Sequence, residues 1–200
     1  KQKGFWIYSF VGGLAQVLAM VSILLSFSLR GFTVGTAYAK IETLMTAFFT
    51  IMLLGEEISS QVFFAIIISL AGVFILSNSK SGKRLQDILF SWTDRSALYG
   101  LASACLLGLS AVSYRGAALS MDANGVLLPA ASTLLVALAI QTTMMTAYLI
   151  LREKGEISKV WRNRGKGLVV GLASMLGSVG WFTAMTLQNA AYVRALGQVE

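Results

Sequence analysis

Histidine is absent from this 200-residue chain, and cysteine occurs once, at Cys105. The absence of histidine excludes histidine-based catalytic triads and histidine metal sites. A single cysteine can form neither a disulfide framework nor a thiolate cluster. We therefore expect no catalytic residues, no bound metal and no cofactor, and we expect that the chain is not an enzyme.

Charged residues are also scarce, at 12% of the chain, whereas soluble domains carry about 25%. Hydrophobic residues make up 56%, and a soluble core of this size could not bury so much apolar surface. The net charge is +7, but Lys and Arg lie mostly between hydrophobic runs, which is typical of membrane topology rather than of nucleic-acid binding. The composition predicts a protein that contacts the lipid bilayer and no nucleic acid.

Six segments are long and apolar enough to be membrane-spanning helices, which need roughly 20 residues each. Their apolar character runs around every face, so lipid or neighbouring helices must cover each one. A seventh helix begins near Ala190 and reaches the last residue, Glu200. Because the chain starts at Lys1 rather than at Met and stops within a helix, we expect a piece of a longer protein. The six segments are residues 5–29, 32–54, 59–77, 96–119, 125–151 and 167–188.

Turn-forming residues separate these segments. Gly55-Glu56-Glu57 ends the second helix, and Ser59 or Ser60 can cap the third. Asn124-Gly125 precedes the fifth helix, and Pro129 falls in its first turns, where a missing N–H costs little.

Two longer polar connections, 78–95 and 152–166, each contain a short amphipathic stretch. These stretches are Leu85 to Trp92 and Ile157 to Trp161. Each either lies on the membrane surface or forms an ordinary loop.

An internal repeat is the most informative pattern. Residues 13–42 align without a gap on 171–200, at an offset of 158, with eight identities in 30 positions. Most identities are Gly, Ala or Leu, which membrane helices share by chance, but the last pair is Glu42 and Glu200. Glutamate inside a membrane helix is rare, so this match carries more weight.

The repeat predicts the architecture. The first helix matches the sixth, so one copy is five helices long, and an odd number of crossings inverts the second copy. The predicted fold is an all-α membrane protein, a polytopic helical bundle of inverted five-helix repeats. The full protein would have ten helices, about six and a half of them here. Residues 1–77 would be the last three helices of the first copy, 78–95 the inter-repeat loop, and 96–200 the second copy, truncated in its fourth helix.

Charged residues within these helices are the candidate site. Glu42 lies ten residues into the segment starting at Phe32, which is roughly 15 Å and half of a bilayer core. A charge at that depth costs about 2.5–3.5 kcal/mol, so Lys40 and Glu42 must face the bundle interior or a water-filled cavity. They either bind substrate or protons, or form an ion pair that only holds the helices together.

Other residues extend the tentative substrate- or proton-binding set. Tyr38 shares the helical face of Glu42, and Glu200 is the repeat mate of Glu42. Gln198 shares a face with Arg194, whose position near its helix start suits snorkelling to the membrane surface. Trp181 completes the set, which is Lys40, Glu42, Glu200, Tyr38, Gln198 and Trp181.

Four further side chains either line a transport pathway or belong to the packing of the bundle. They are those of Gln16, Tyr114 and Gln141, and that of Trp181 from the set above. Glu56 and Glu57 lie in a connection and are expected to be solvated.

Three stretches carry a family resemblance. They are Gly35 to Glu42 (GTAYAKIE), Leu53 to Ser59 (LLGEEIS) with Ala71-Gly72-Val73 after it, and Gly180 to Thr183 (GWFT) with Arg194 to Glu200 (RALGQVE). They resemble the fourth helix, the following turn and the matching second-copy region of the EamA-like family of the drug/metabolite transporter (DMT) superfamily. The resemblance implies ten helices in two inverted repeats and transport of small metabolites.

The functional expectation is a secondary-active transporter, a permease or exporter of small polar metabolites such as amino acids, working by alternating access. The alternative is a structural or regulatory membrane subunit that transports nothing. We expect that the partner is a small-molecule metabolite and that the protein is a multi-pass protein of the cell (inner) membrane. It acts either as a single chain or as a homodimer. Alternate loops carry 11 and 4 basic residues, and the positive-inside rule places the richer side in the cytoplasm. The resemblance to a ten-helix family with both termini inside implies the opposite orientation, so both remain open.

Overall fold

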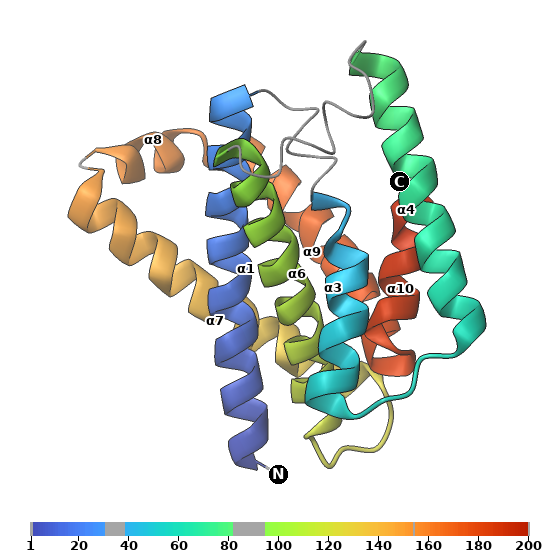
Figure 1. Cartoon of the computed structure of the whole chain (residues 1–200). Helices are drawn as coiled ribbons and strands as arrows, with labels where there is room; N and C mark the ends of the chain where they lie inside the picture. Colours follow the sequence, from blue (N-terminus) through green and yellow to red (C-terminus); the bar gives the residue numbers. More distant parts are fainter. Residues whose placement is uncertain (1, 31–38, 82–94, 154, 200) are drawn as a thin grey trace.

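Every regular element in the described part of the chain is a helix (Figure 1). The structure is a computed structural model and describes residues 2–30, 39–81, 95–153 and 155–199. The elements are α1 (Gln2–Arg30), α3 (Glu42–Phe49), the π-helical segment η1 (Thr50–Leu54), α4 (Ser60–Ser81), α6 (Arg95–Leu119), α7 (Leu127–Arg152), α8 (Glu156–Arg162), α9 (Arg164–Leu187), α10 (Ala190–Leu196) and the 3₁₀ turn η2 (Gly197–Val199).

Within those residues, four helices are long and apolar enough to cross a membrane. They span Gln2–Leu29, Arg95–Leu119, Leu127–Arg152 and Arg164–Leu187, in α1, α6, α7 and α9. Two further apolar stretches are shorter, Glu42–Leu54 and Ser60–Gly72 within α4. The expectation of an all-helical membrane protein is confirmed at this level.

Small residues allow α1 and α6 to pack along most of their length. A Cβ on Gly12 would lie 2.7 Å from the Tyr114 ring, so glycine is needed for this approach. The Ser26 hydroxyl donates to the Ser96 carbonyl at 2.7 Å, and the Ser103 hydroxyl donates to the Ala19 carbonyl at 3.0 Å. Close packing and interhelical hydrogen bonds are the main forces between helices in lipid.

The backbones of α3 and α6 also lie in close contact. A Cβ on Gly108 would lie 2.8 Å from the backbone nitrogen of Thr46. This contact fixes α3 against the α1–α6 pair, and with it the polar residues at the start of α3.

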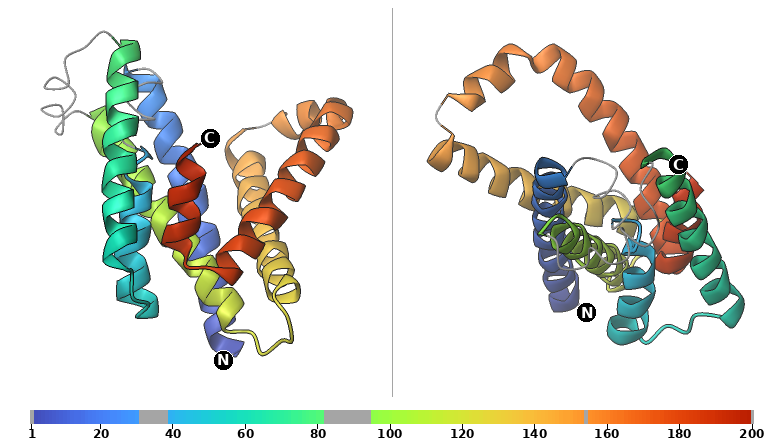
Figure 2. Two further views of the ribbon diagram at one scale, coloured as in Figure 1. Left: turned by 90° about the vertical axis from the view of Figure 1, so that its right-hand side faces the viewer. Right: turned by 45° about the horizontal axis from the view of Figure 1, so that its top comes forward.

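The helices α7, α8 and α9 form an arm that diverges from the other helices toward α8 (Figure 2). Large apolar side chains on α9 are exposed, among them Leu168, Val170 and Leu176, as expected where lipid or another helix covers them. Helix α8 exposes Val160 and Trp161, and the Arg164 guanidinium lies 5.0 Å from the Trp161 ring. A hydrogen bond to Glu156 raises the pKa of the Lys159 ammonium in this short helix.

Several predicted helix ends are confirmed. Gly55 ends η1 with φ of 63°, in the left-handed region that favours glycine. The Ser59 hydroxyl accepts from the Val62 N–H at 3.4 Å and caps α4. Helix α4 continues past the expected end at Ser77 to Ser81, so the predicted connection 78–95 is shorter.

The predicted continuous helix over 32–54 is wrong in its middle. Helix α3 begins at Glu42, after a turn at Lys40 and Ile41, and residues 31–38 lie outside the described residues. Glu42 therefore lies in the first turn of a helix rather than deep inside one. Apolar periodicity could not indicate this break, because apolar residues flank it on both sides.

Candidate functional site

The carboxylate of Glu42 forms an ion pair between two helices. Arg194 Nη1, on α10, lies 2.7 Å from Glu42 Oε1, and both side chains are largely buried. A carboxylate in the first turn of a helix is also stabilised by the helix dipole. The expected snorkelling of Arg194 is therefore wrong, because its guanidinium has a carboxylate partner within the bundle.

An aromatic ring holds the other side of this guanidinium. The Arg194 guanidinium carbon lies 5.1 Å from the centre of the Trp181 ring on α9. Arginine over an aromatic face gains a favourable cation–π interaction. A Cβ on Gly197 would lie 2.2 Å from the same ring, so the glycine makes room for Trp181.

Gln198, in the turn after α10, contacts the start of α3 and the turn before it. Its Nε2 donates to the Lys40 carbonyl oxygen at 3.3 Å and contacts the Thr43 hydroxyl. Lys40 enters this cluster through its backbone carbonyl, which the turn before α3 leaves free of a helical hydrogen bond. Gln198 and Lys40 are 158 residues apart, which is the offset of the repeat.

The cluster contains buried polar groups that have no hydrogen-bond partner among the described residues. Arg194 Nε and Gln198 Oε1 are buried and find no hydrogen-bond partner there. The contact at Glu42 Oε1 is a close ion pair without hydrogen-bond geometry. Buried groups of this kind are costly unless a ligand or water satisfies them.

A cavity of about 810 Å³ lies beside the cluster, between α9 and α10. Its walls are mostly apolar and include Trp181, Gly197, Gly180 and Tyr192. The volume falls within the range of small-molecule pockets, which are usually apolar with a few polar groups. The Trp181 ring contacts the charged cluster on one side and belongs to the wall of this cavity on the other.

The structure brings together four of the six predicted site residues: Lys40, Glu42, Trp181 and Gln198. Tyr38 and Glu200 lie outside the described residues. Two members were missed, Arg194 and Thr43. The sequence could have indicated Arg194, because it lies four residues before Gln198 and so shares its helical face. Nothing in the sequence distinguishes Thr43, because threonine is common in membrane helices.

A second polar cluster joins α1, α6 and α7. The Tyr114 hydroxyl donates to Gln16 Oε1 at 2.7 Å. Gln141 Nε2 donates to Gln16 Oε1 at 2.8 Å and to the Tyr114 oxygen at 2.9 Å. The Tyr114 ring packs on Phe182, with centroids 4.7 Å apart.

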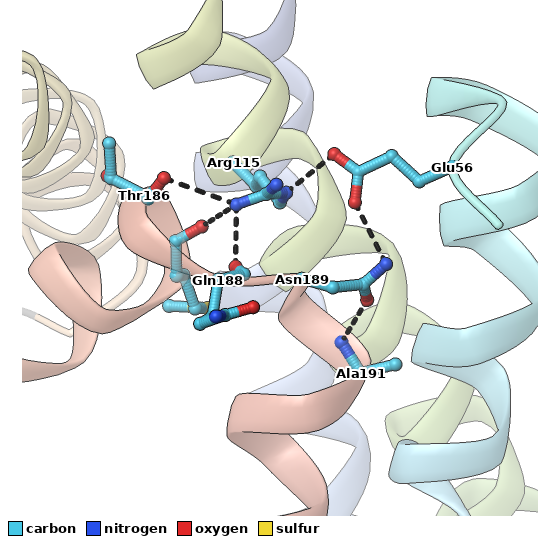
Figure 3. Close-up of polar contacts among 7 residues, drawn as sticks. Glu56, Arg115, Thr186, Gln188, Asn189 and Ala191 are labelled. Atoms are coloured by element: carbon cyan, nitrogen blue, oxygen red, sulfur yellow. Dashed lines mark hydrogen bonds and ion pairs between the residues drawn. The ribbon is translucent and has the colours of Figure 1, made fainter. Parts of the chain in front are cut away.

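A third cluster centres on Arg115, which is buried near the end of α6 (Figure 3). Its Nε donates to Glu56 Oε1 at 2.8 Å. Its Nη1 donates to the carbonyl oxygens of Met185 at 2.6 Å, Thr186 at 3.3 Å and Gln188 at 2.5 Å. A cation at the last carbonyls of α9 satisfies groups that the helix itself leaves free.

The same cluster caps α10. Asn189 Nδ2 donates to Glu56 Oε2 at 2.8 Å, and Asn189 Oδ1 accepts from the Ala191 N–H at 2.9 Å (Figure 3). The expectation that Glu56 is solvated is wrong, because Arg115 and Asn189 bind both of its oxygens. Glu57 is exposed, as expected. Sequence spacing could not indicate the Arg115–Glu56 pair, since the two residues lie far apart in the chain.

Chemically, the first cluster offers a cation, a carboxylate and an aromatic face beside an apolar cavity. Such a set can hold a small molecule that carries both charges and an apolar portion.

Comparisons with known proteins add no relative. No family model, no curated protein and no solved structure matches this chain.

Proposed function

We propose that this protein is a secondary-active transporter of small polar metabolites such as amino acids, in the cell (inner) membrane, working by alternating access. The observation that carries the proposal is the Glu42–Arg194 ion pair, with its unsatisfied polar atoms beside the cavity at Trp181. Ionisable residues within membrane bundles commonly mark substrate or ion pathways.

The proposed architecture is a pair of inverted repeats, as in the EamA-like DMT family that the sequence resembles. Two features support it. The repeat-equivalent helices α1 and α9 run in opposite directions (Figure 1). In addition, Gln198 contacts Lys40 at the repeat offset, as expected for equivalent positions that meet at an axis relating the copies.

A turn at Lys40–Ile41 interrupts the helix before α3. Discontinuous helices line the midplane sites of many transporters, because their free backbone groups bind charged ligands.

In this mechanism a zwitterionic substrate replaces the internal ion pair. Its carboxylate binds the Arg194 guanidinium, its ammonium group binds Glu42, and its apolar portion enters the cavity beside Trp181. Substrate binding thereby separates α3 from α10, which belong to different repeats. That separation links occupancy of the site to movement of the repeats.

The Arg115 cluster lies near the end of α6, at the opposite end of the bundle from α8 (Figure 1), and in the proposed cycle it holds that end closed. Arg115 and Glu56 connect α6, the α3–α4 connection and the α9–α10 junction. Alternating access requires this cluster to break when that end opens.

The test is substrate counterflow in vesicles that contain the protein expressed from its complete gene, with a panel of labelled amino acids. We expect Glu42→Gln and Arg194→Gln each to reduce counterflow by roughly 10-fold or more, since a charged hydrogen bond contributes about 1.5–3 kcal/mol. Glu57→Gln, an exposed carboxylate, is the matched control and should leave counterflow unchanged. Unaltered transport in Glu42→Gln would sink the proposal.

A non-transporting structural subunit is the second candidate, and the pairing of Glu42 with Arg194 favours it. Counterflow by the native protein separates the two candidates, because a structural subunit shows none. In a protein that transports, the double variant Glu42→Arg with Arg194→Glu tests the pair itself: if the pair only holds helices together, the swap restores both stability and counterflow. If it binds substrate, the swap restores stability alone, because the carboxylate and the cation have exchanged positions.

A further inference from the structure

The Gln16–Tyr114–Gln141 cluster uses only part of its hydrogen-bonding groups internally. Gln16 Oε1 accepts two hydrogen bonds, one from Tyr114 and one from Gln141. The second Gln141 N–H donates to the Tyr114 oxygen. A carboxamide has two donors and one carbonyl acceptor. The Gln16 NH₂ group and the Gln141 carbonyl oxygen therefore remain, and neither bonds to a described residue.

A separate cavity of about 330 Å³ lies at this cluster, between α1 and α7. Gln16 and Gln141 form its polar end, and Val17, Met20, Leu24 and Met145 form its apolar walls. No charged side chain is among its lining residues within the described chain. An unpaired carboxamide facing an apolar cavity gains from a ligand that satisfies it.

We propose that this cavity binds a neutral molecule with a carboxamide head and a short apolar body. The head accepts from the Gln16 NH₂ group and donates to the Gln141 carbonyl oxygen, and the body packs on Met20, Leu24 and Met145. A charged head is excluded, because the site offers no counter-charge and burial of an unpaired ion is costly. The proposal does not depend on transport, since it rests on a different cavity from the Glu42–Arg194 cluster.

The probe is octanamide fluorinated at its terminal methyl group, observed by fluorine NMR with the complete protein in nanodiscs. Empty nanodiscs report partitioning into lipid alone. We expect an additional protein-bound signal for octanamide. Binding should be several-fold weaker for methyl octanoate, which accepts but does not donate, and should be absent for octylammonium, which is charged. These comparisons use the native protein and so do not depend on the folding of any variant.

Substitutions of the two glutamines test whether octanamide binds in this cavity. Gln16→Leu and Gln141→Leu should each weaken octanamide binding by roughly 3–10-fold, the value of one neutral hydrogen bond. Gln61→Leu, an exposed glutamine on α4, is the matched control and should bind like the native protein. Equal binding of octanamide and octylammonium, or native binding in Gln141→Leu, would overturn the proposal.

Discussion

Gln198 donates a hydrogen bond to the Lys40 carbonyl oxygen at 3.3 Å, across 158 residues of chain. This is the offset at which residues 13–42 align on 171–200. The repeat match that the sequence provides and this tertiary contact therefore agree at one pair of positions. In the proposed inverted repeat, such a contact is expected where an axis relates the two copies.

Replacing Gln198 should loosen the contact between α3 and α10. Gln198→Leu removes the hydrogen bonds to Lys40 and Thr43, and we expect a loss of about 1–2 kcal/mol in the free energy of unfolding. Denaturant unfolding in detergent measures it. Gln61→Leu removes an exposed glutamine of the same size and should change this energy little, so equal losses in both variants would contradict the assignment.

Removing the Arg115 side chain should be the most destabilising of these changes. Arg115→Ala leaves the Glu56 carboxylate with only Asn189 and frees three carbonyls at and just after the end of α9, and we expect a loss of about 3–5 kcal/mol in the free energy of unfolding. Glu56→Gln should cost less, because an amide oxygen still accepts from Asn189 or from Arg115.

The adjacent residue supplies the control for this pair. Glu57→Gln alters an exposed carboxylate next to Glu56 and should change stability by less than about 0.5 kcal/mol. A double-mutant cycle of Arg115→Ala and Glu56→Gln should show coupling, since the two side chains share one cluster. Additive losses would mean that the two residues act independently.

The glycine at position 108 should not tolerate a side chain. Gly108→Ala places a Cβ 2.8 Å from the Thr46 backbone nitrogen, so α3 must shift from α6, at a cost of about 1–3 kcal/mol. Gly72→Ala on α4 meets no atom within 4 Å and should be neutral or slightly stabilising. Thermal unfolding of the two variants side by side is the measurement, and equal unfolding midpoints would refute the close contact.

Adding a methyl group at position 197 should displace Trp181. In Gly197→Ala the new Cβ would overlap the Trp181 ring, which then leaves the Arg194 guanidinium. We expect a changed tryptophan emission spectrum and reduced substrate counterflow. Gly177→Ala lines the same cavity without a neighbour within 4 Å, so it should leave both readouts as in the native protein.

The positions of the helices followed from local properties of the chain. Apolar runs of membrane-spanning length, glycine turns and serine caps predicted the observed elements α1, α4, α6, α7 and α9 to within a few residues. These signals are local, because a helix satisfies its own backbone in lipid. The break before Glu42 escaped them, since it lies between two apolar stretches.

The interaction partners of the polar residues could not be predicted from the sequence. The rarity of charge inside an apolar helix marked Glu42 as important, and the same reasoning marked Lys40. Yet the carboxylate pairs with Arg194, and the neighbouring lysine contributes its backbone carbonyl. Likewise, Gln16, Tyr114 and Gln141 were noticed one by one, but only the packing of α1, α6 and α7 joins them.

Composition, the length of the apolar runs and the turn residues between them were thus enough to predict a helical membrane protein and the approximate ends of its helices, because lipid forces each helix to satisfy its own backbone. Which helices meet, and at what rotation, depends on glycine-sized contacts such as Gly108 against Thr46 and on hydrogen bonds between distant residues. Those contacts decided that Glu56 is bound to Arg115 rather than solvated, and that Glu42 faces Arg194. A side chain's partner is a property of the packed bundle and not of its own segment.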